Sequence, residues 1–446
     1  MTKAREQWGT GTGFVLATIG SAVGLGNIWR FSYVAGENGG GAFLIVYLLS
    51  VVLVGLPIVI GEMALGRYGR GDAVAAFAKA APRSLWRHAG WLPVAGCLLI
   101  LSFYGVIAGW ALKYFVGAAT GALWQEAAGG FGGYFQSFIA NRGEPLGWQL
   151  AMMVLTMLVV AGGVRRGIEG VNRYLMPLLA LCVVALAVYS ATLEGASAGW
   201  RFLFVPDWGA LSQSRVLGAA VGQAFFSLGV GMAVFITYAS YLKPDARIPR
   251  FAVAIVAGDT LFALVAGLAI FPAVFAFGMD PQSGPQLAFI TLPQIFLVMP
   301  GGPLVGIAFF GLLVAAALTS MVSLLEVPVA AVIHRTGIGR RRAVLLIGVA
   351  VFVIGIPSAL SFGVLADVRI FGRGVLDAVD AAVSNYLLPI GGILVCLHIG
   401  WYLKASQALE AAGLSGRRLG GAWLLLLRFV APATIAVILW NTVIAP

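Results

Sequence analysis

The chain has 446 residues, of which 60% are hydrophobic and 10% carry a charged side chain. Soluble domains are about 45–50% apolar and about 25% charged, so this composition excludes an ordinary soluble enzyme, a nucleic-acid-binding domain and a disordered chain. The net charge of +11 then belongs to a membrane protein, in which the question is on which side of the bilayer the cations lie.

Eleven apolar stretches approach the roughly 20 residues that a helix needs to cross a bilayer. They are 11–35, 42–67, 90–117, 147–163, 172–193, 216–241, 251–279, 303–333, 343–361, 377–403 and 422–444. The loop 280–302 contains ITLPQIFLVMPGG, which is too apolar for a free loop and predicts a small helix over the mouth of the protein. We predict an all-α integral membrane protein that forms one domain over 1–446, with no soluble domain between the spans.

Lysine and arginine set the orientation, because cytoplasmic loops are enriched in these residues. With the N-terminus in the cytoplasm, 21 of the 28 Lys and Arg residues fall on the inner side. With eleven spans, the C-terminus then lies outside. Short termini and short outer loops favour a bacterial inner membrane.

Two spans carry glycine clusters next to polar residues. The first span has glycines at 20, 24 and 26 followed by Asn27, and the sixth has Gly229 and Gly231 after Ser227. Glycine also serves close helix packing, so either cluster alone is ambiguous. Breaks at corresponding positions of two halves, however, indicate the binding site of a transporter built from inverted repeats. We predict repeats over 11–193 and 216–403, with the helix 422–444 outside them.

Unwound backbone at mid-membrane frees carbonyl and N–H groups that must find partners. Carbonyls can bind a cation, and N–H groups at the start of a half-helix can hold a carboxylate. In the eighth span, small and hydroxylated residues share one stripe: Ala316, Thr319, Ser320, Ser323 and Leu324. Such a stripe serves either helix packing or binding of a hard cation. Tyr104 in the third span could bind a substrate carboxylate or a neighbouring backbone.

These segments resemble the neurotransmitter:sodium symporter family, and most closely its bacterial amino-acid transporters. The resemblance rests on REQWGTGTGFVLATIGSAVGLGNIWRF at 5–31, ENGGGAFLIVY at 37–47, GQAFFSLGVGMAVFITYASY at 222–241, LTS at 318–320 and the acidic pair at 377–380. It implies a LeuT-like fold of 5+5 inverted repeats with an eleventh transmembrane helix, in which helices 1 and 6 are unwound at mid-membrane. It also implies sodium-coupled import of amino acids.

The resemblance further implies two sodium sites and a substrate pocket. The first sodium would be bound by Ala22, Asn27, Ser227, Asp259 and the substrate carboxylate, and the second by Gly20, Val23, Ala316, Thr319 and Ser320. The substrate would be bound by Ala22, Gly24, Gly26, Ile100, Tyr104, Phe226, Ser227, Gly229, Met232, Ser320 and Leu324. The gates would involve Arg30, Asp380 and Gln223 outside, and Arg5, Trp8 and Tyr238 inside.

Departures from the family pattern sharpen these expectations. Gly24 stands where monoamine carriers have an acid, so the carboxylate must come from the substrate, as in an amino acid. A pocket without charged side chains favours large apolar or aromatic amino acids, because an unpaired charge would be costly there. Two residues predict chloride independence: Asp259, which carries a negative charge of its own, and Ala263, which stands where chloride-dependent relatives have a serine. Asp259 is also a candidate for proton counter-transport.

The inner gate is the least regular part of the pattern. His334 stands where relatives have the aspartate that pairs with the arginine at Arg5. Either Arg5 has another acceptor, or the inner gate is weaker and pH-sensitive through His334. Glu62 and Glu326 are further acids inside spans, each either functional or simply hydrogen-bonded.

Two rival functions remain open at this point. A sodium-independent amino-acid exchanger of the same fold would carry a lysine on span 5 in place of the second sodium, and none is present there. A non-transporting amino-acid sensor would use the same site as a transporter. No metal triad, nucleophile elbow or phosphate loop is present, so we predict that the chain is not an enzyme.

Overall fold

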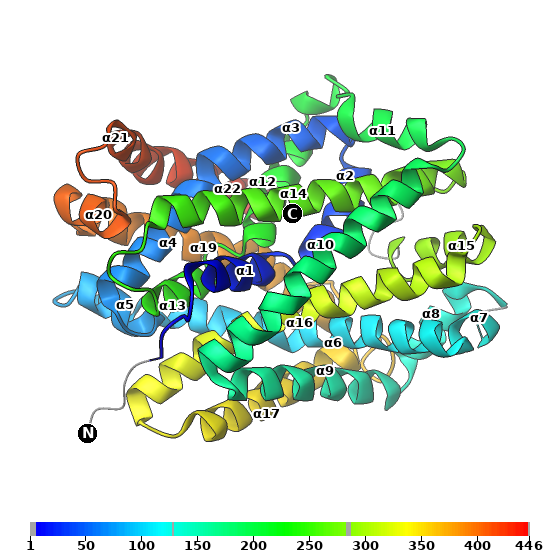
Figure 1. Cartoon of the computed structure of the whole chain (residues 1–446), viewed down its shortest axis with the longest axis horizontal. Coiled ribbons are helices and arrows are strands. Elements are labelled where there is room, and N and C mark those ends of the chain that lie inside the picture. Colours follow the sequence, from blue (N-terminus) through cyan, green and yellow to red (C-terminus); the bar gives the residue numbers. More distant parts are fainter. Residues whose placement is uncertain (1–5, 127–128, 282–286, 445–446) are drawn as a thin grey trace.

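The structure is a computed structural model, and it describes residues 6–126, 129–281 and 287–444. Within these ranges all named elements are helical, and extended pairing is confined to two isolated β-bridges. Figure 1 shows the long helices packed side by side, with the short α1 in the middle of the view.

In the first half of the chain, the helices range from short ones of 5 residues to α6 with 30 residues. The bounds are α1 Gly11–Ala22, α2 Phe31–Glu37, α3 Gly41–Ser50, α4 Leu56–Gly69, α5 Ala73–Ala80, α6 Trp91–Thr120, α7 Ala122–Glu126, α8 Phe131–Ala140, α9 Glu144–Ala161, α10 Gly170–Ala191 and α11 Ala196–Phe204.

The second half repeats this alternation of short and long elements. The bounds are α12 Ser214–Leu228, α13 Val234–Ser240, α14 Ile248–Ala276, α15 Thr291–Val298, α16 Gly302–Thr336, α17 Arg340–Ala359, α18 Val375–Ala382, α19 Leu388–Leu397, α20 Ala405–Ala412, α21 Arg418–Leu425 and α22 Ala431–Ile444.

Among the described residues, nine helices are long and apolar enough to span a membrane. The first predicted span appears as α1 and the segment Gly26–Glu37, which meet at an angle of 52°. The sixth appears as α12 and α13, separated by residues 229–233. The eleven predicted spans are therefore all represented by helices, and the small helix predicted in 280–302 is α15. The repeat boundaries 11–193 and 216–403 and the separate helix 422–444 stay predictions.

The two breaks have different backbone causes. In helix 1, Val23 adopts an extended conformation after α1, at φ −69° and ψ 105°. In helix 6, Gly229, Gly231 and Ala233 all have positive φ, at 66°, 86° and 57°. Left-handed residues interrupt the ladder of helical hydrogen bonds, and glycine adopts them without a steric penalty. Both predicted breaks are confirmed.

The breaks lie among the longest helices. α1 packs against α10, α14 and α16, while α16 runs along α6, and α13 packs on α4. This arrangement brings residues from both halves of the chain to the unwound segments.

Candidate functional site

A small cavity of about 40 Å³ lies between the two breaks. All eleven residues that the sequence predicted for substrate binding line it: Ala22, Gly24, Gly26, Ile100, Tyr104, Phe226, Ser227, Gly229, Met232, Ser320 and Leu324. Four further lining residues were not predicted as pocket residues, namely Ser21, Leu228, Val234 and Ser323. The structure thus gathers the predicted set in one place, with no charged side chain among the residues that line it.

The backbone of the helix 1 break faces this cavity. The Leu25 amide donates a hydrogen bond of 2.9 Å to the Tyr104 hydroxyl. Gly24 leaves no room for a side chain, because a Cβ there would lie 2.4 Å from Ser320 Oγ and 2.7 Å from Tyr104 Oη. Tyr104 therefore binds the unwound backbone, one of its two predicted roles, and also lines the cavity. Its binding of a substrate carboxylate stays a prediction.

Asn27, Ser227 and Asp259 form one hydrogen-bonded cluster beside the cavity, and all three are buried. The Asn27 amide nitrogen donates to Asp259 Oδ1 at 2.7 Å and to Ser227 Oγ at 3.0 Å. Ser227 Oγ donates to Asp259 Oδ2 at 2.8 Å, and Asn27 Oδ1 accepts from the Gly24 amide at 3.0 Å. The side chains predicted for the first sodium are thereby adjacent, and Ala22 lines the same cavity.

The hydroxyl stripe of α16 faces the end of α1. Ser320 Oγ lies 3.2 Å from the Ser21 carbonyl and 3.5 Å from the Val23 carbonyl, and Thr319 Oγ1 donates to the Ala316 carbonyl at 2.9 Å. Four of the five groups predicted for the second sodium, Val23, Ala316, Thr319 and Ser320, therefore lie at this junction. A hydrogen bond of 2.7 Å also joins Ser21 Oγ to Ser323 Oγ.

The fifth predicted group, Gly20, faces α10. A Cβ at Gly20 would lie 2.1 Å from Asn172 Oδ1 and 2.9 Å from Met176 Sδ. Asn172 is buried, and its Oδ1 has no hydrogen-bond partner within the described chain. Asn172 could not be predicted as a neighbour of Gly20, because a single asparagine in an apolar span does not reveal which helix it faces.

The outer gate residues are arranged differently from the predicted ion pair. Arg30 and Asp380 line the same cavity of about 240 Å³, yet no ion pair joins them among the described residues. The Arg30 guanidinium lies 4.2 Å from the centre of the Phe226 ring, while Asp380 accepts from Ser384 Oγ at 2.8 Å. Gln223 Nε2 donates to the Gly26 carbonyl at 2.8 Å. Direct pairing of Arg30 with Asp380 is thus not a feature of this conformation.

At the opposite end, the segment before α1 covers α13. Trp8 Nε1 donates to the Tyr238 carbonyl at 2.8 Å, and the two ring centres are 5.1 Å apart. The Gly9 amide and the Thr10 hydroxyl both donate to Glu169, at 2.7 and 3.0 Å. Trp8 and Tyr238 therefore meet as predicted, whereas Arg5 lies outside the described residues.

His334 lies close to a carboxylate, and its relation to Arg5 falls outside the described residues. Its Nε2 lies 3.9 Å from Asp72 Oδ2, in front of α5, and the imidazole is exposed. A buried ion pair lies nearby instead, in which Arg340 binds Glu326 and also reaches Glu6 at 3.1 Å. Tyr241 donates to Glu326 at 2.8 Å. Glu326 is therefore a paired acid, and its partner Arg340 could not be assigned from the basic loop alone.

Glu62 binds the helix 6 break. This fully buried residue on α4 accepts a hydrogen bond of 2.6 Å from the Gly231 amide. A Cβ at Gly231 would lie 2.3 Å from the Leu388 carbonyl oxygen, so α19 closes the other side of the break. Glu62 is thus a hydrogen-bonded part of the unwound segment, away from the residues that line the cavity.

Comparison with known proteins identifies the family to which this chain is similar. A model of the sodium:neurotransmitter symporter family matches residues 5–131 and 134–446. The sodium-dependent transporter YhdH of Bacillus subtilis is 44% identical over 441 residues, covering 98% of this chain and 97% of its own length. The sodium-dependent transporter MJ1319 of Methanocaldococcus jannaschii is 33% identical over 457 residues, covering 98% of this chain and 90% of its own length.

A solved structure, that of MhsT in complex with L-phenylalanine, has a TM-score of 0.93 and 52% sequence identity. The match covers 98% of this chain and 100% of that one. The fold is therefore LeuT-like, as the resemblance implied. The members of the matching family are transporters and not enzymes. This chain belongs to the sodium:neurotransmitter symporter family and is a multi-pass, sodium-dependent membrane transporter.

Proposed function

We propose that the protein is a sodium-coupled symporter that imports large neutral L-amino acids, apolar or aromatic, by alternating access. The observation that carries this proposal is the single cavity between the two helix breaks, lined by backbone from both breaks and by the predicted pocket residues. The similarity to MhsT, solved with L-phenylalanine, supports an amino acid as the substrate.

The substrate carboxylate would bind at the helix 1 break. The backbone around Gly24 and Gly26 and the Tyr104 hydroxyl offer polar groups there, and helix N-terminal amides favour an anion. Since a Cβ at Gly24 would clash with Ser320 and Tyr104, no acidic side chain fits this position. The carboxylate therefore comes from the substrate. Side chains such as Ile100, Met232 and Leu324 then favour an apolar substrate side chain.

Two sodium ions would bind on either side of this carboxylate. The first would take the Ala22 carbonyl, Asn27, Ser227, Asp259 and the substrate, and the second the carbonyls of Gly20, Val23 and Ala316 with Thr319 and Ser320. Oxygen donors of this kind suit a hard cation. Because the first ion shares its ligands with the substrate, each stabilises the bound state of the other. Sodium would bind first, and closure over Phe226 and Arg30 would precede opening on the other side.

Chloride independence follows from Asp259 in this proposal. Its carboxylate is held by Asn27 and Ser227 and, while it is ionised, supplies the negative charge that a bound chloride would otherwise provide. We expect identical uptake when chloride is replaced by gluconate.

The exchanger alternative is disfavoured by α10. The residues of α10 that face Gly20 are Asn172 and Met176, and neither can replace the charge of a sodium ion. Positive-inside bias supports a bacterial inner-membrane location with the N-terminus in the cytoplasm and the C-terminus outside.

The experiment is uptake into proteoliposomes with a sodium gradient, using the twenty amino acids as substrates. We expect accumulation of leucine, phenylalanine or tryptophan above equilibrium, and its loss when sodium is replaced by potassium. Accumulation without sodium would favour the exchanger. Sodium-dependent binding without any uptake would favour the sensor.

A further inference from the structure

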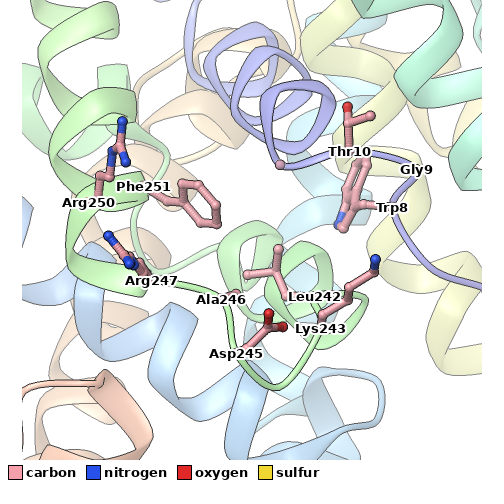
Figure 2. Close-up of a pocket in the computed structure, with 11 residues that line it drawn as sticks. Trp8, Gly9, Thr10, Leu242, Lys243, Asp245, Ala246, Arg247, Arg250 and Phe251 are labelled. Carbon is pink, nitrogen blue, oxygen red and sulfur yellow. The ribbon is translucent and has the colours of Figure 1, made fainter.

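A second cavity, of about 280 Å³, lies where the segment before α1 meets the connection between α13 and α14. This volume is close to the lower end of the roughly 300–1,000 Å³ typical of small-ligand pockets. It is separate from the site between the helix breaks, since no residue lines both cavities. Figure 2 shows it with its lining residues.

Three cations and one acid line this cavity. Lys243, Arg247 and Arg250 contribute positive charge, and Asp245 is the one carboxylate among the lining residues. Figure 2 shows Arg247 and Arg250 on one side of the cavity and Lys243 on the opposite side. An anion between them would therefore meet cations from two directions.

These cations are not used inside the protein. Within the described residues, Lys243, Arg247 and Arg250 form neither an ion pair nor a hydrogen bond from their side chains, and all three are exposed. Arg340, by contrast, is fully engaged by Glu326 and Glu6. The cavity thus offers guanidinium groups with free donors, which is the group that binds phosphate oxygens in pairs.

Three large apolar side chains also line the cavity. Trp8, Leu242 and Phe251 line it, and Phe251 packs on Phe14 at a ring distance of 5.4 Å. A cationic rim over an apolar floor fits an amphiphile better than a small hydrated anion, whose hydration shell the aromatic residues cannot replace.

The cavity also adjoins a stripe of exposed apolar residues. On α14, Arg250 is followed at helical spacing by Val253, Ala257 and Leu261, all exposed, with Val253 at 52% and Leu261 at 62%. Positions i, i+3, i+7 and i+11 share one face of a helix. A phosphate bound by Arg250 could therefore leave its acyl chains on an apolar track that begins at the same residue.

We propose that this cavity binds the phosphate headgroup of an anionic phospholipid from the leaflet on the N-terminal side of the protein. Arg247 and Arg250 hold the phosphate oxygens, and Lys243 adds a third positive charge. The acyl chains lie along Val253, Ala257 and Leu261. The bound lipid joins the segment before α1 to the start of α14.

Native mass spectrometry of the purified full-length protein tests this. Phosphatidylglycerol, phosphatidylcholine and inorganic phosphate are titrated separately, and then phosphate is titrated against phosphatidylglycerol. We expect one phosphatidylglycerol to bind at least about tenfold more tightly than phosphatidylcholine, because its headgroup carries a net negative charge, whereas the choline cation of phosphatidylcholine is repelled by the three cations of the cavity.

The variant R247Q/R250Q should lose this tenfold preference. The matched control is R341Q/R342Q, which removes two exposed arginines from the start of another helix, α17, and should keep the preference within about twofold. Sodium-dependent amino-acid binding and the melting temperature check that each variant is folded. If the double variant does not fold, the single variants R247Q and R250Q carry the same test.

The proposal is overturned if R247Q/R250Q keeps the preference, or if both double variants lose it equally, since a nonspecific attraction to basic surface then suffices. It is also overturned if inorganic phosphate displaces phosphatidylglycerol at equimolar concentration, because the ligand would then be a free phosphate. Displacement only at a large molar excess of phosphate supports the lipid.

Discussion

The two breaks in the membrane helices are stabilised in different ways. At the helix 1 break, the partners of the backbone are the Asn27 amide oxygen and the Tyr104 hydroxyl, and Tyr104 lines the central cavity. At the helix 6 break, the partner is Glu62 from α4, and the backbone of α19 lies against Gly231. Both breaks border the cavity, but the side chains that hold helix 1 take part in the proposed ligand site, whereas Glu62 and α19 hold helix 6 from outside the cavity lining.

Because of this difference, we expect ligands to change the stability of one break and not of the other. The groups at helix 1 are those that sodium and substrate would also use, so the order of this break should depend on both. The break in helix 6 has its hydrogen bond satisfied without a ligand, so it should be equally stable with and without sodium.

The largest effect is expected for Gly231→Ala. Gly231 has φ +86°, and a Cβ there would lie 2.3 Å from the Leu388 carbonyl oxygen. A left-handed alanine and a backbone clash together cost about 2–5 kcal/mol of folding free energy. Thermal unfolding in detergent measures this, and the loss should be the same with and without sodium. Gly222→Ala, on α12 with nothing within 4 Å of its Cβ, is the control and should melt like the wild type.

Asn27→Ala should have the next largest effect, and here on ligand binding. Asn27 joins the Gly24 amide to Ser227 and Asp259, so its loss leaves buried groups unpaired. We expect sodium-dependent amino-acid affinity to fall roughly a hundredfold, measured by equilibrium binding. Asn38→Ala, which removes a buried asparagine on the same broken helix outside the cavity, should leave the affinity within about threefold. Equal effects of both variants would show that helix 1 matters only for folding.

Glu62→Ala tests how the break in helix 6 is stabilised. Without this carboxylate the Gly231 amide has lost its acceptor, which costs about 1–3 kcal/mol of stability. Glu62→Gln keeps an acceptor oxygen and should lose far less. Thermal unfolding with and without sodium checks both variants. If the loss of stability disappeared when sodium was added, Glu62 would belong to the ligand site and not only to the support of the helix 6 break.

The smallest effect on folding is expected for Ser320→Ala. Its hydroxyl donates only weakly to the backbone, since its contacts with the Ser21 and Val23 carbonyls are long, at 3.2 and 3.5 Å. The sodium-free protein should therefore lose less than about 1 kcal/mol. The increase in melting temperature on adding sodium should nevertheless shrink, because the proposed second ion loses a ligand. Ser102→Ala, a buried serine bonded within α6, is the control. An unchanged sodium shift in Ser320→Ala would remove Ser320 from the ion site.

The sequence predicted the parts of this site that are written in local patterns. The glycines beside Asn27 and Ser227 indicated where helices break, and the spacing of Thr319 and Ser320 indicated one face of a helix. Family resemblance then placed Asp259 and Tyr104. Partners contributed by distant helices were out of reach, because a lone polar residue in an oily span does not reveal its neighbour. Glu62, Asn172 and Arg340 are of this kind, and the contact of His334 with Asp72 also depends on tertiary packing.

Arg340 has a consequence for turnover. One guanidinium binds the buried Glu326 on α16 and Glu6 in the segment that covers the N-terminal side. When that segment departs, Arg340 can release the half-exposed Glu6 and keep the buried Glu326. Giving up a surface ion pair costs about 0–1 kcal/mol, which as an activation barrier slows a step by less than about tenfold. Arg340 therefore lets the segment open at little cost while the buried charge of Glu326 stays paired.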